Sequence, residues 1–287
     1  MPTADALPDA AGADVGSTLA KLVLPGADGA TRCETLPAAD LDAVAAQLLA
    51  CAPSRVGLTG AGASRLARRL AAPHRFFEES QAWAAGARAA VESDADTGPF
   101  LLVSVGTGTS IMRVDPEGVA RLGGTALGGG TLLGLGRHLC GSGSFEELSR
   151  LAARGDRGRV DLRIGDVYGG DAAPLPAQAT ASAFGRLARG DGGEPVRRED
   201  FAAAVVGMVG ENVGLLCMAH AGAQQTRRIV FGGSSLVGNE ALAGLLRLVC
   251  LAFGAHPHFP EEGPYFGALG ARALVRAGVG PQASPTR

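Results

Sequence analysis

Two glycine turns flanked by hydroxyl side chains could bind phosphate in this chain. The first occupies residues 14–18 and begins with Asp14, and the second occupies residues 106–110, with glycines at both 106 and 108. Glycine lets successive backbone N–H groups point together at an anion, and a serine or threonine hydroxyl adds a further donor. A nearby aspartate can hold a magnesium ion through water. Two such turns, far apart in one chain, predict a nucleotide held between two lobes.

The only lysine of the 287-residue chain, Lys21, lies just beyond the first turn. All other basic residues are arginine, so a lysine at this point indicates chemistry that a guanidinium group does not reproduce. One interpretation is that Lys21 approaches the phosphates of a nucleotide. The alternative is a strand lysine whose stem packs on the protein while its ammonium group reaches water.

Composition excludes several classes of protein. Lys and Arg total 26 against 28 for Asp and Glu, and this near-neutral balance argues against a nucleic-acid partner. The five cysteines are odd in number and lack CxxC spacing, which favours small core residues in a reducing compartment. No signal peptide and no apolar run of about 18 residues is recognisable, so we expect a cytoplasmic protein without a membrane partner.

The turns fall between predicted strands. The first joins residues 10–13, whose alanines and glycine make a poor strand, to an apolar strand near residue 22. The second joins Phe100–Val105 to its hairpin partner, and a later strand, residues 228–231, ends in another glycine turn. Helical periodicity is expected near residues 41–49, 80–91, 132–139, 145–154, 201–221, 239–253 and 265–277. Because strands alternate with helices, the fold class is α/β.

A polar, turn-rich segment, residues 93–99, is the expected boundary between two lobes. We therefore expect an N-terminal lobe, residues 1–98, and a C-terminal lobe, residues 99–287. Residues 155–195 are expected to be rich in loops.

The order of these turns resembles the superfamily that unites actin, hexokinase and the Hsp70 chaperones, whose two-lobed ATPase fold has a cleft between the lobes. A P-loop is excluded, because no GxxxxGK[ST] occurs. Within the superfamily the chain is similar to the type II pantothenate kinases, and DVGSTLAK at 14–21 resembles their DxGGTLxK motif. The other matching segments follow in family order: TGAGA at 59–63, GTGTS at 106–110, RLGGTALGGGT at 121–131, SFEE at 144–147, DVYGGD at 166–171, FGGSS at 231–235 and EGPYFGA at 262–268.

The resemblance implies transfer of the γ-phosphoryl group of ATP to the primary hydroxyl of pantothenate, the first step toward coenzyme A. Spacing alone leaves Glu78 and Glu79 both open as the general base, because either acid suits a helix N-terminus. The resemblance favours Glu78, whose pKa the two preceding phenylalanines would raise by desolvation.

Further roles carry over by the same resemblance. Arg121 is implied as the anchor for the substrate carboxylate or the transferring phosphoryl group, although without the resemblance an ordinary strand-end arginine would be the preferred interpretation. Asp14 is implied to organise Mg²⁺ through water. The substrate-binding residues would be Arg121, Thr107, Gly108 and Thr109, and the ATP-binding residues Asp14, Gly16, Ser17, Thr18, Lys21, Gly106, Gly128, Gly129, Gly130, Gly232, Gly233 and Ser234.

Two departures from the family pattern and two alternative functions remain. Ser17 replaces the second glycine of the first turn, and the strand before Asp14 is weak, so weaker ATP binding is expected. An amino-sugar kinase of the same superfamily would keep the fold but typically uses an aspartate base. A catalytically inactive nucleotide-binding scaffold would lack the base or Arg121. The apolar helices near residues 145–154 and 201–221 predict a homodimer.

Overall fold

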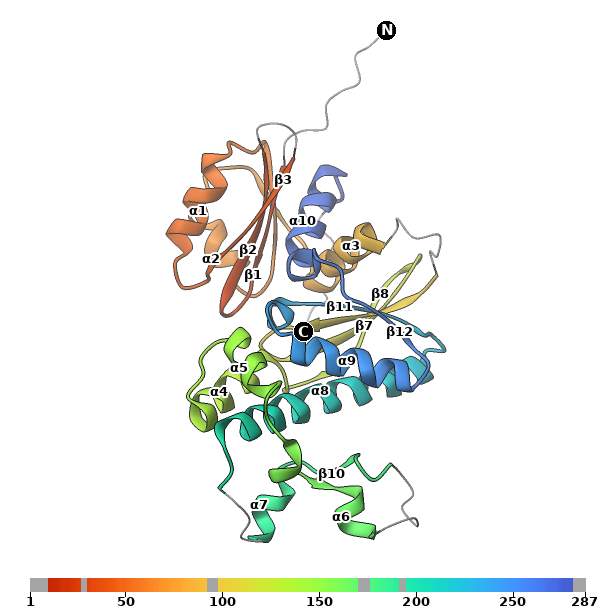
Figure 1. Cartoon of the computed structure of the whole chain (residues 1–287). Helices are drawn as coiled ribbons and strands as arrows, with labels where there is room; N and C mark the ends of the chain where they lie inside the picture. The colour runs from red at the N-terminus through yellow and green to blue at the C-terminus, as the bar shows by residue number, and fades with distance from the viewer. Residues whose placement is uncertain (1–9, 27–29, 92–97, 170–175, 191–194, 281–287) are drawn as a thin grey trace.

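The computed structural model describes residues 10–26, 30–91, 98–169, 176–190 and 195–280. The chain forms two five-stranded sheets with helices packed around them, and Figure 1 shows the sheets as separate lobes with helices α3 (Glu79–Val91) and α10 (Phe266–Arg276) between them. The predicted α/β class is confirmed. Most of the expected lobe boundary lies outside the described residues.

The N-terminal sheet has the strand order β3-β2-β1-β4-β5, with β1 parallel to β4 and antiparallel to β2. Helices α1 (Leu41–Ala50) and α2 (Ala63–Ala67) bury their apolar residues with this sheet. Both are short. The strands are β1 (Ala10–Val15), β2 (Leu19–Pro25), β3 (Thr31–Pro37), β4 (Arg55–Thr59) and β5 (His74–Phe76).

Strand β1 is the central strand of this sheet and is buried along its whole length, although its sequence predicted a weak strand. The reason is its contact with α10 (Phe266–Arg276). A Cβ added at Gly12 would overlap the carbonyl oxygen of Ala268, and one added at Gly57 would overlap that of Ala271. The small residues therefore let the backbone of α10 lie directly on the sheet. The residues of β1 have low strand propensity because the close contact with α10 requires small side chains.

The C-terminal sheet has the order β12-β11-β6-β7-β8. Its hairpin between β6 and β7 is the predicted one, and Ser144 caps α5 as its capping-box pattern predicts, accepting a hydrogen bond from the N–H of Glu147 at 3.2 Å. The strands are β6 (Phe100–Val105), β7 (Thr109–Asp115), β8 (Gly118–Thr125), β11 (Arg228–Gly232) and β12 (His256–His258). The helices are α4 (Gly129–Cys140), α5 (Phe145–Ala152), α8 (Arg198–Ala223) and α9 (Glu240–Ala252), followed along the chain by the 3₁₀ turn η3 (Gly263–Tyr265).

Helix α8 is long and apolar enough to cross a membrane by length and composition alone. However, 61% of its most apolar stretch is buried inside the protein, mainly in the core beneath the C-terminal sheet. That burial is the environment of a core helix.

Helices α3 (Glu79–Val91) and α10 cross at backbone contact and connect the lobes. A Cβ on Gly270 would overlap the carbonyl oxygen of Ala82, and a Cβ on Gly86 would overlap that of Phe266. The apolar face of α3 packs with β6 and β7 of the C-terminal sheet, whereas α10 lies on β1 and β4. The expected division at residue 98 would assign α3 to the N-terminal lobe, although α3 packs on the C-terminal sheet. It would likewise assign α10 to the C-terminal lobe, although α10 packs on the N-terminal sheet.

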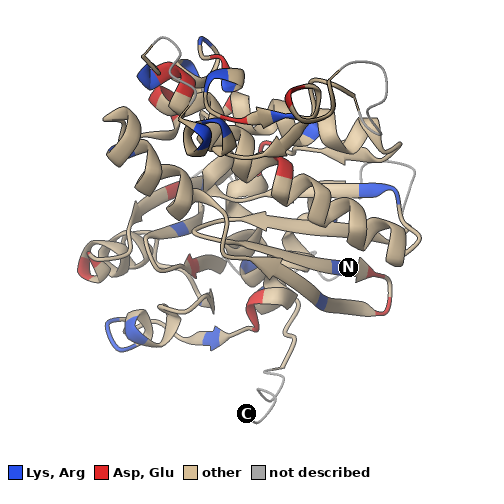
Figure 2. Ribbon diagram, turned by 90° about the horizontal axis from the view of Figure 1, so that it is seen from below, with Lys and Arg blue, Asp and Glu red and all other residues tan. Residues whose placement is uncertain are grey.

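Residues 155–169 and 176–190, in a stretch that was expected to be rich in loops, form a small arm that projects from α8 at the bottom of Figure 1. Its elements are the 3₁₀ turn η1 (Arg157–Arg159), β9 (Leu162–Arg163), α6 (Ile164–Tyr168), β10 (Thr180–Ser182) and α7 (Gly185–Arg189). Figure 2 shows basic and acidic segments interleaved along the chain.

Ion pairs hold the arm to α8. Arg157 donates to Glu211 of α8 at 2.6 and 3.1 Å and to Asp161 at 2.8 Å, while only 1% of the Asp161 side chain is exposed. Burial opposes the charge on Arg157, but the hydrogen bonds and charges of Glu211 and Asp161 outweigh it and raise the pKa of the guanidinium.

Replacing Arg157 with methionine is expected to destabilise the protein by about 2–3 kcal/mol, because two carboxylates would remain at the site with no cation between them. The free energy of unfolding from urea titration would measure the loss. Arg189→Met, an exposed change in the same arm, is the matched control and should cost less than about 0.5 kcal/mol. Equal losses in the two variants would contradict this role of the ion pairs.

Candidate active site

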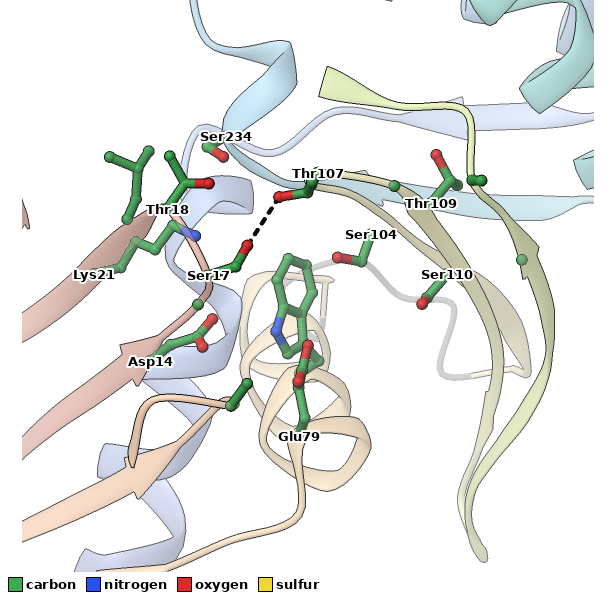
Figure 3. A pocket seen from close by; sticks show the side chains of 18 of the residues that line it. Asp14, Ser17, Thr18, Lys21, Glu79, Ser104, Thr107, Thr109, Ser110 and Ser234 are labelled. Atoms are coloured by element: carbon green, nitrogen blue, oxygen red, sulfur yellow. Dashed lines mark hydrogen bonds between the residues drawn. The ribbon is translucent and has the colours of Figure 1, made fainter. Parts of the chain in front are cut away.

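A cleft of about 610 Å³ lies between the two sheets, and residues of both glycine turns line it. This volume is within the range of roughly 300–1,000 Å³ that is typical of small-molecule sites. Figure 3 shows side chains from both lobes pointing into it. The expected site residues that line the cleft are Asp14, Gly16, Ser17, Thr18, Lys21, Gly106, Thr107, Gly108, Thr109, Arg121 and Ser234.

Asp14, the penultimate residue of β1, is 3% exposed. Glycines make room for its carboxylate: a Cβ on Gly60 would stand 2.6 Å from Oδ1, and Gly60 also has a φ of +87° that favours glycine. Burial raises the pKa of Asp14, while Lys21 lowers it, followed by the indole N–H of Trp83. Lys21 is the register partner of Asp14 on β2, so the antiparallel pairing itself places this charge beside the carboxylate.

The tips of the two glycine turns meet across the cleft. The hydroxyl groups of Ser17 and Thr107 form a hydrogen bond of 3.1 Å, drawn as the dashed line in Figure 3. In the first turn, the N–H of Gly16 donates a hydrogen bond to the carbonyl oxygen of Leu19 at 3.0 Å. In the second turn, the N–H of Gly106 donates one to the carbonyl oxygen of Gly108 at 2.9 Å. Hydroxyl groups from both lobes therefore face one shared space.

The structure places the two candidate glutamates in different surroundings. Glu79 lines the cleft, whereas Glu78 lines a separate depression beside α3 and β8. Phe77 is buried and Phe76 is 44% exposed, so the two phenylalanines do not enclose Glu78 as expected. Glu79 is the first residue of α3, and Figure 3 shows its side chain in the same pocket as that of Asp14.

The surroundings of the Glu79 carboxylate act on its pKa in both directions. Its side chain is reached by water in the cleft, yet desolvation by the surrounding protein is the largest influence that raises its pKa. Asp14 raises that pKa further, Lys21 lowers it, Glu78 raises it and Arg121 lowers it. Arg121, from β8, therefore acts on the same carboxylate as Lys21 from the other lobe.

The glycine run at 128–130 supports the second turn and does not line the cleft. The N–H of Gly129 donates to the carbonyl oxygen of Gly106 at 2.8 Å, and that of Gly130 donates to Thr107 at 2.9 Å. A Cβ on Gly128 would stand 2.7 Å from the backbone of Gly108. Two of the amides expected to contact ATP are thus occupied by the protein backbone, and the run shapes the turn that borders the cleft.

Gly232 and Gly233 also pack against the protein backbone. A Cβ on Gly232 would lie 2.7 Å from the carbonyl oxygen of Gly263, and Gly233 has a φ of +116° beside the backbone of Val105. Of the three residues expected at the adenosine, only Ser234 lines the cleft.

Sequence reasoning gave no site role to three polar or aromatic residues that line the cleft, Ser104, Thr125 and Trp83. Ser104 is the register partner of Ser110, which belongs to the second turn, so the pairing of the hairpin strands could have placed Ser104 beside that turn. Trp83 is 4% exposed and belongs to a hydrophobic core cluster, and it also lines the cleft. Its spacing of four residues from Glu79 would have put both on one face of the helix.

The donor set fits magnesium better than a metal that needs a protein cage. The described residues contain no group of three or more His, Cys, Asp and Glu side chains able to hold an ion. Magnesium keeps several waters and commonly uses one or two carboxylates together with substrate phosphates. Asp14 and Glu79 offer carboxylates in a cleft that both phosphate turns border.

Comparison with known proteins adds to this geometry. A family model described as Fumble matches residues 61–274. The type II pantothenate kinase of Staphylococcus aureus strain USA300 is 31% identical over 266 residues, which are 92% of this chain and 99% of the relative, and the enzyme of strain MRSA252 is 31% identical over 264 residues, 92% and 98% of the two chains.

Solved structures share the fold. The activator of 2-hydroxyisocaproyl-CoA dehydratase from Clostridium difficile, with bound ADPNP, superposes with a TM-score of 0.64 at 16% identity over 96% of this chain and all of its own. A glucokinase of the ROK family from Streptomyces griseus, in complex with glucose and AMPPNP, gives 0.58 at 12% identity over 93% and 98%. These likenesses confirm the expected two-lobed actin/hexokinase/Hsp70-like fold. From the sequence match over nearly its whole length, the chain belongs to the type II pantothenate kinase family.

Proposed function

We propose that this protein transfers the γ-phosphoryl group of ATP to the primary hydroxyl of pantothenate. The observation that carries the proposal is one cleft in which two hydroxyl-bearing glycine turns, an acid with a raised pKa and two cations converge. Phosphoryl transfer depends mainly on positioning and on charge stabilisation, and these groups supply both. Family membership selects pantothenate as the acceptor.

Glu79 is the general base in this proposal, in place of Glu78. It is the glutamate that the cleft presents to an acceptor, and a carboxylate whose pKa is raised by burial holds a proton more readily than an ordinary one. Such a base takes the hydroxyl proton as the oxygen attacks phosphorus. Its activity is lost as the pH falls through the raised pKa, because the protonated form accepts no proton.

The cations have separate roles on the two sides of the cleft. Arg121 offers a forked guanidinium that suits the carboxylate of the acceptor or the transferring phosphoryl group. Lys21 and the two turns bind the phosphates of ATP. Asp14 would hold Mg²⁺ through water, and the metal would supply positive charge beside those phosphates.

A homodimer is also proposed, but on a surface different from the one expected. The apolar residues of α5 and most of those of α8 are already buried within one chain. Exposed large apolar side chains remain at Leu215 of α8, at Leu248 and Leu251 of α9, and at Phe253, which follows α9. A dimer formed there would cover them, and light scattering at micromolar concentration would show whether the mass is that of two chains.

The function is tested by measuring ADP release from ATP and magnesium with pantothenate, with N-acetylglucosamine and with no acceptor. Turnover that depends on pantothenate is the expected result. Turnover with the sugar alone would assign an amino-sugar kinase. Nucleotide binding without turnover on either acceptor would assign an inactive scaffold.

Glu79→Gln is expected to lower kcat by about a hundredfold or more while nucleotide affinity changes little, because only the proton acceptor is lost. Glu78→Gln, the same change at the adjacent residue outside the cleft, is the matched control and should keep kcat within about threefold. Steady-state kinetics of both variants with pantothenate would measure this. The reverse pattern would return the base to Glu78.

Glu79→Gln is also expected to stabilise the fold at neutral pH. A raised pKa means that ionising this carboxyl costs free energy in the folded state that it does not cost in the unfolded chain. The gain should therefore be complete above the folded-state pKa and disappear below the ordinary pKa of a glutamate, where both states carry the neutral acid. The gain would be measured from the urea midpoints of the variant and the unaltered protein, at neutral pH and at a pH below the ordinary pKa of a glutamate. A gain of equal size at acid and neutral pH would contradict this explanation.

A further inference from the structure

Trp83, the only tryptophan of the chain, lies at the floor of the cleft. It follows Glu79 by four residues on α3, so the two side chains share one face of the helix. The ring packs edge-on against Phe266 of α10, with centroids 6.1 Å apart and an angle of 87° between the planes. The side chain is 4% exposed, and phenylalanine could satisfy the same apolar packing.

The indole N–H distinguishes Trp83 from a packing residue. Among the described residues it is a buried donor without a hydrogen-bond partner, and such a group costs free energy unless it is used. It lies beside Asp14: a Cβ added at Gly267 would stand 2.9 Å from Nε1 of Trp83 and 2.7 Å from Cγ of Asp14. The absence of a side chain at Gly267 thus leaves the donor and the carboxylate facing one small space.

We propose that Trp83 is a positioning residue whose indole N–H donates to the carboxylate of Asp14 and fixes its orientation toward the magnesium–nucleotide complex. In the proposed arrangement the carboxylate of Asp14 turns within the space beside Gly267 to accept this hydrogen bond. Consistent with that contact, the N–H is one of the groups that lower the pKa of Asp14 against its burial. The inference rests on the proposed use of ATP and magnesium, and not on the identity of the acceptor.

Lys21 and Trp83 act on the carboxylate of Asp14 in different ways. Lys21 approaches Asp14 along the sheet, from its register partner position on β2, and supplies charge. Trp83 approaches from α3 and supplies a directed donor. An oriented carboxylate holds a metal-bound water at one position, whereas an unrestrained one must lose rotational freedom when the metal binds.

A single-atom replacement tests this role. Because the chain has one tryptophan, growth of a tryptophan auxotroph on β-(3-benzothienyl)alanine replaces this residue alone and exchanges the N–H for sulfur with nearly the same shape. The matched control carries 7-azatryptophan, which keeps the N–H. Thermal melting of both proteins checks that each is folded.

The readout is the affinity for the non-hydrolysable analogue AMPPNP, measured by calorimetry with and without Mg²⁺. The benzothienyl protein is expected to bind the analogue about tenfold more weakly in the presence of Mg²⁺ and equally well in its absence, since a lost hydrogen bond to a charged group is worth about that factor. The azatryptophan protein should match the unaltered one in both conditions.

Each other result overturns the inference in a recognisable way. Equal affinity of both proteins with Mg²⁺ would make Trp83 a packing residue only. An equal loss with and without Mg²⁺ would mean that the N–H acts on the nucleotide and not through Asp14. Failure of the unaltered protein to bind AMPPNP would reject the proposed function together with this inference, whereas normal binding without the magnesium-specific loss would reject this inference alone.

Discussion

The backbone contact between α10 and the N-terminal sheet is the constraint on which the rest of the structure depends. Gly12 and Gly57 let the helix lie directly on β1 and β4, and the glycines of α3 and α10 let those helices cross at the same distance. A side chain at any of these positions would push the elements apart and move the end of β1. Asp14 is the penultimate residue of that strand and lies beside Gly267 of α10, so one packing interface both joins the lobes and places the carboxylate.

That interface creates an electrostatic cost within the cleft. Asp14 and Glu79 are brought together in partly desolvated surroundings, and the pKa of each is raised first by burial. Lys21 and Arg121 oppose the rise from opposite lobes. The fold therefore keeps two mutually repelling acids where uncharged residues would be more stable, which is the usual relation between stability and a functional site.

The sequence predicted the hairpin turns well, because glycine patterns reflect local backbone requirements. It failed where the deciding contact is distant in the chain. Strand propensity predicted a weak strand before Asp14, because the contact with α10 that buries this strand comes from the other end of the chain. Gly128 was predicted to bind ATP, although it packs on Gly108. The choice between Glu78 and Glu79 depended on which one the start of α3 turns inward, a rotation of one residue that spacing alone does not fix. The arm, held by ion pairs such as that of Arg157, gave no periodic signal.

Ser17 shows how a departure from a family pattern acquires a physical meaning. Its hydroxyl group contacts that of Thr107, so the residue that replaces a glycine also links the tips of the two lobes. A phosphate group placed between the turns competes for the same hydroxyls. An exposed hydrogen bond of this kind contributes about 0.5–1.5 kcal/mol, so breaking it would weaken ATP binding by about tenfold at most. Hydrogen bonds from the same hydroxyls to the charged phosphate would offset that loss, because charge-assisted bonds are the stronger ones. The serine is therefore compatible with a working nucleotide site.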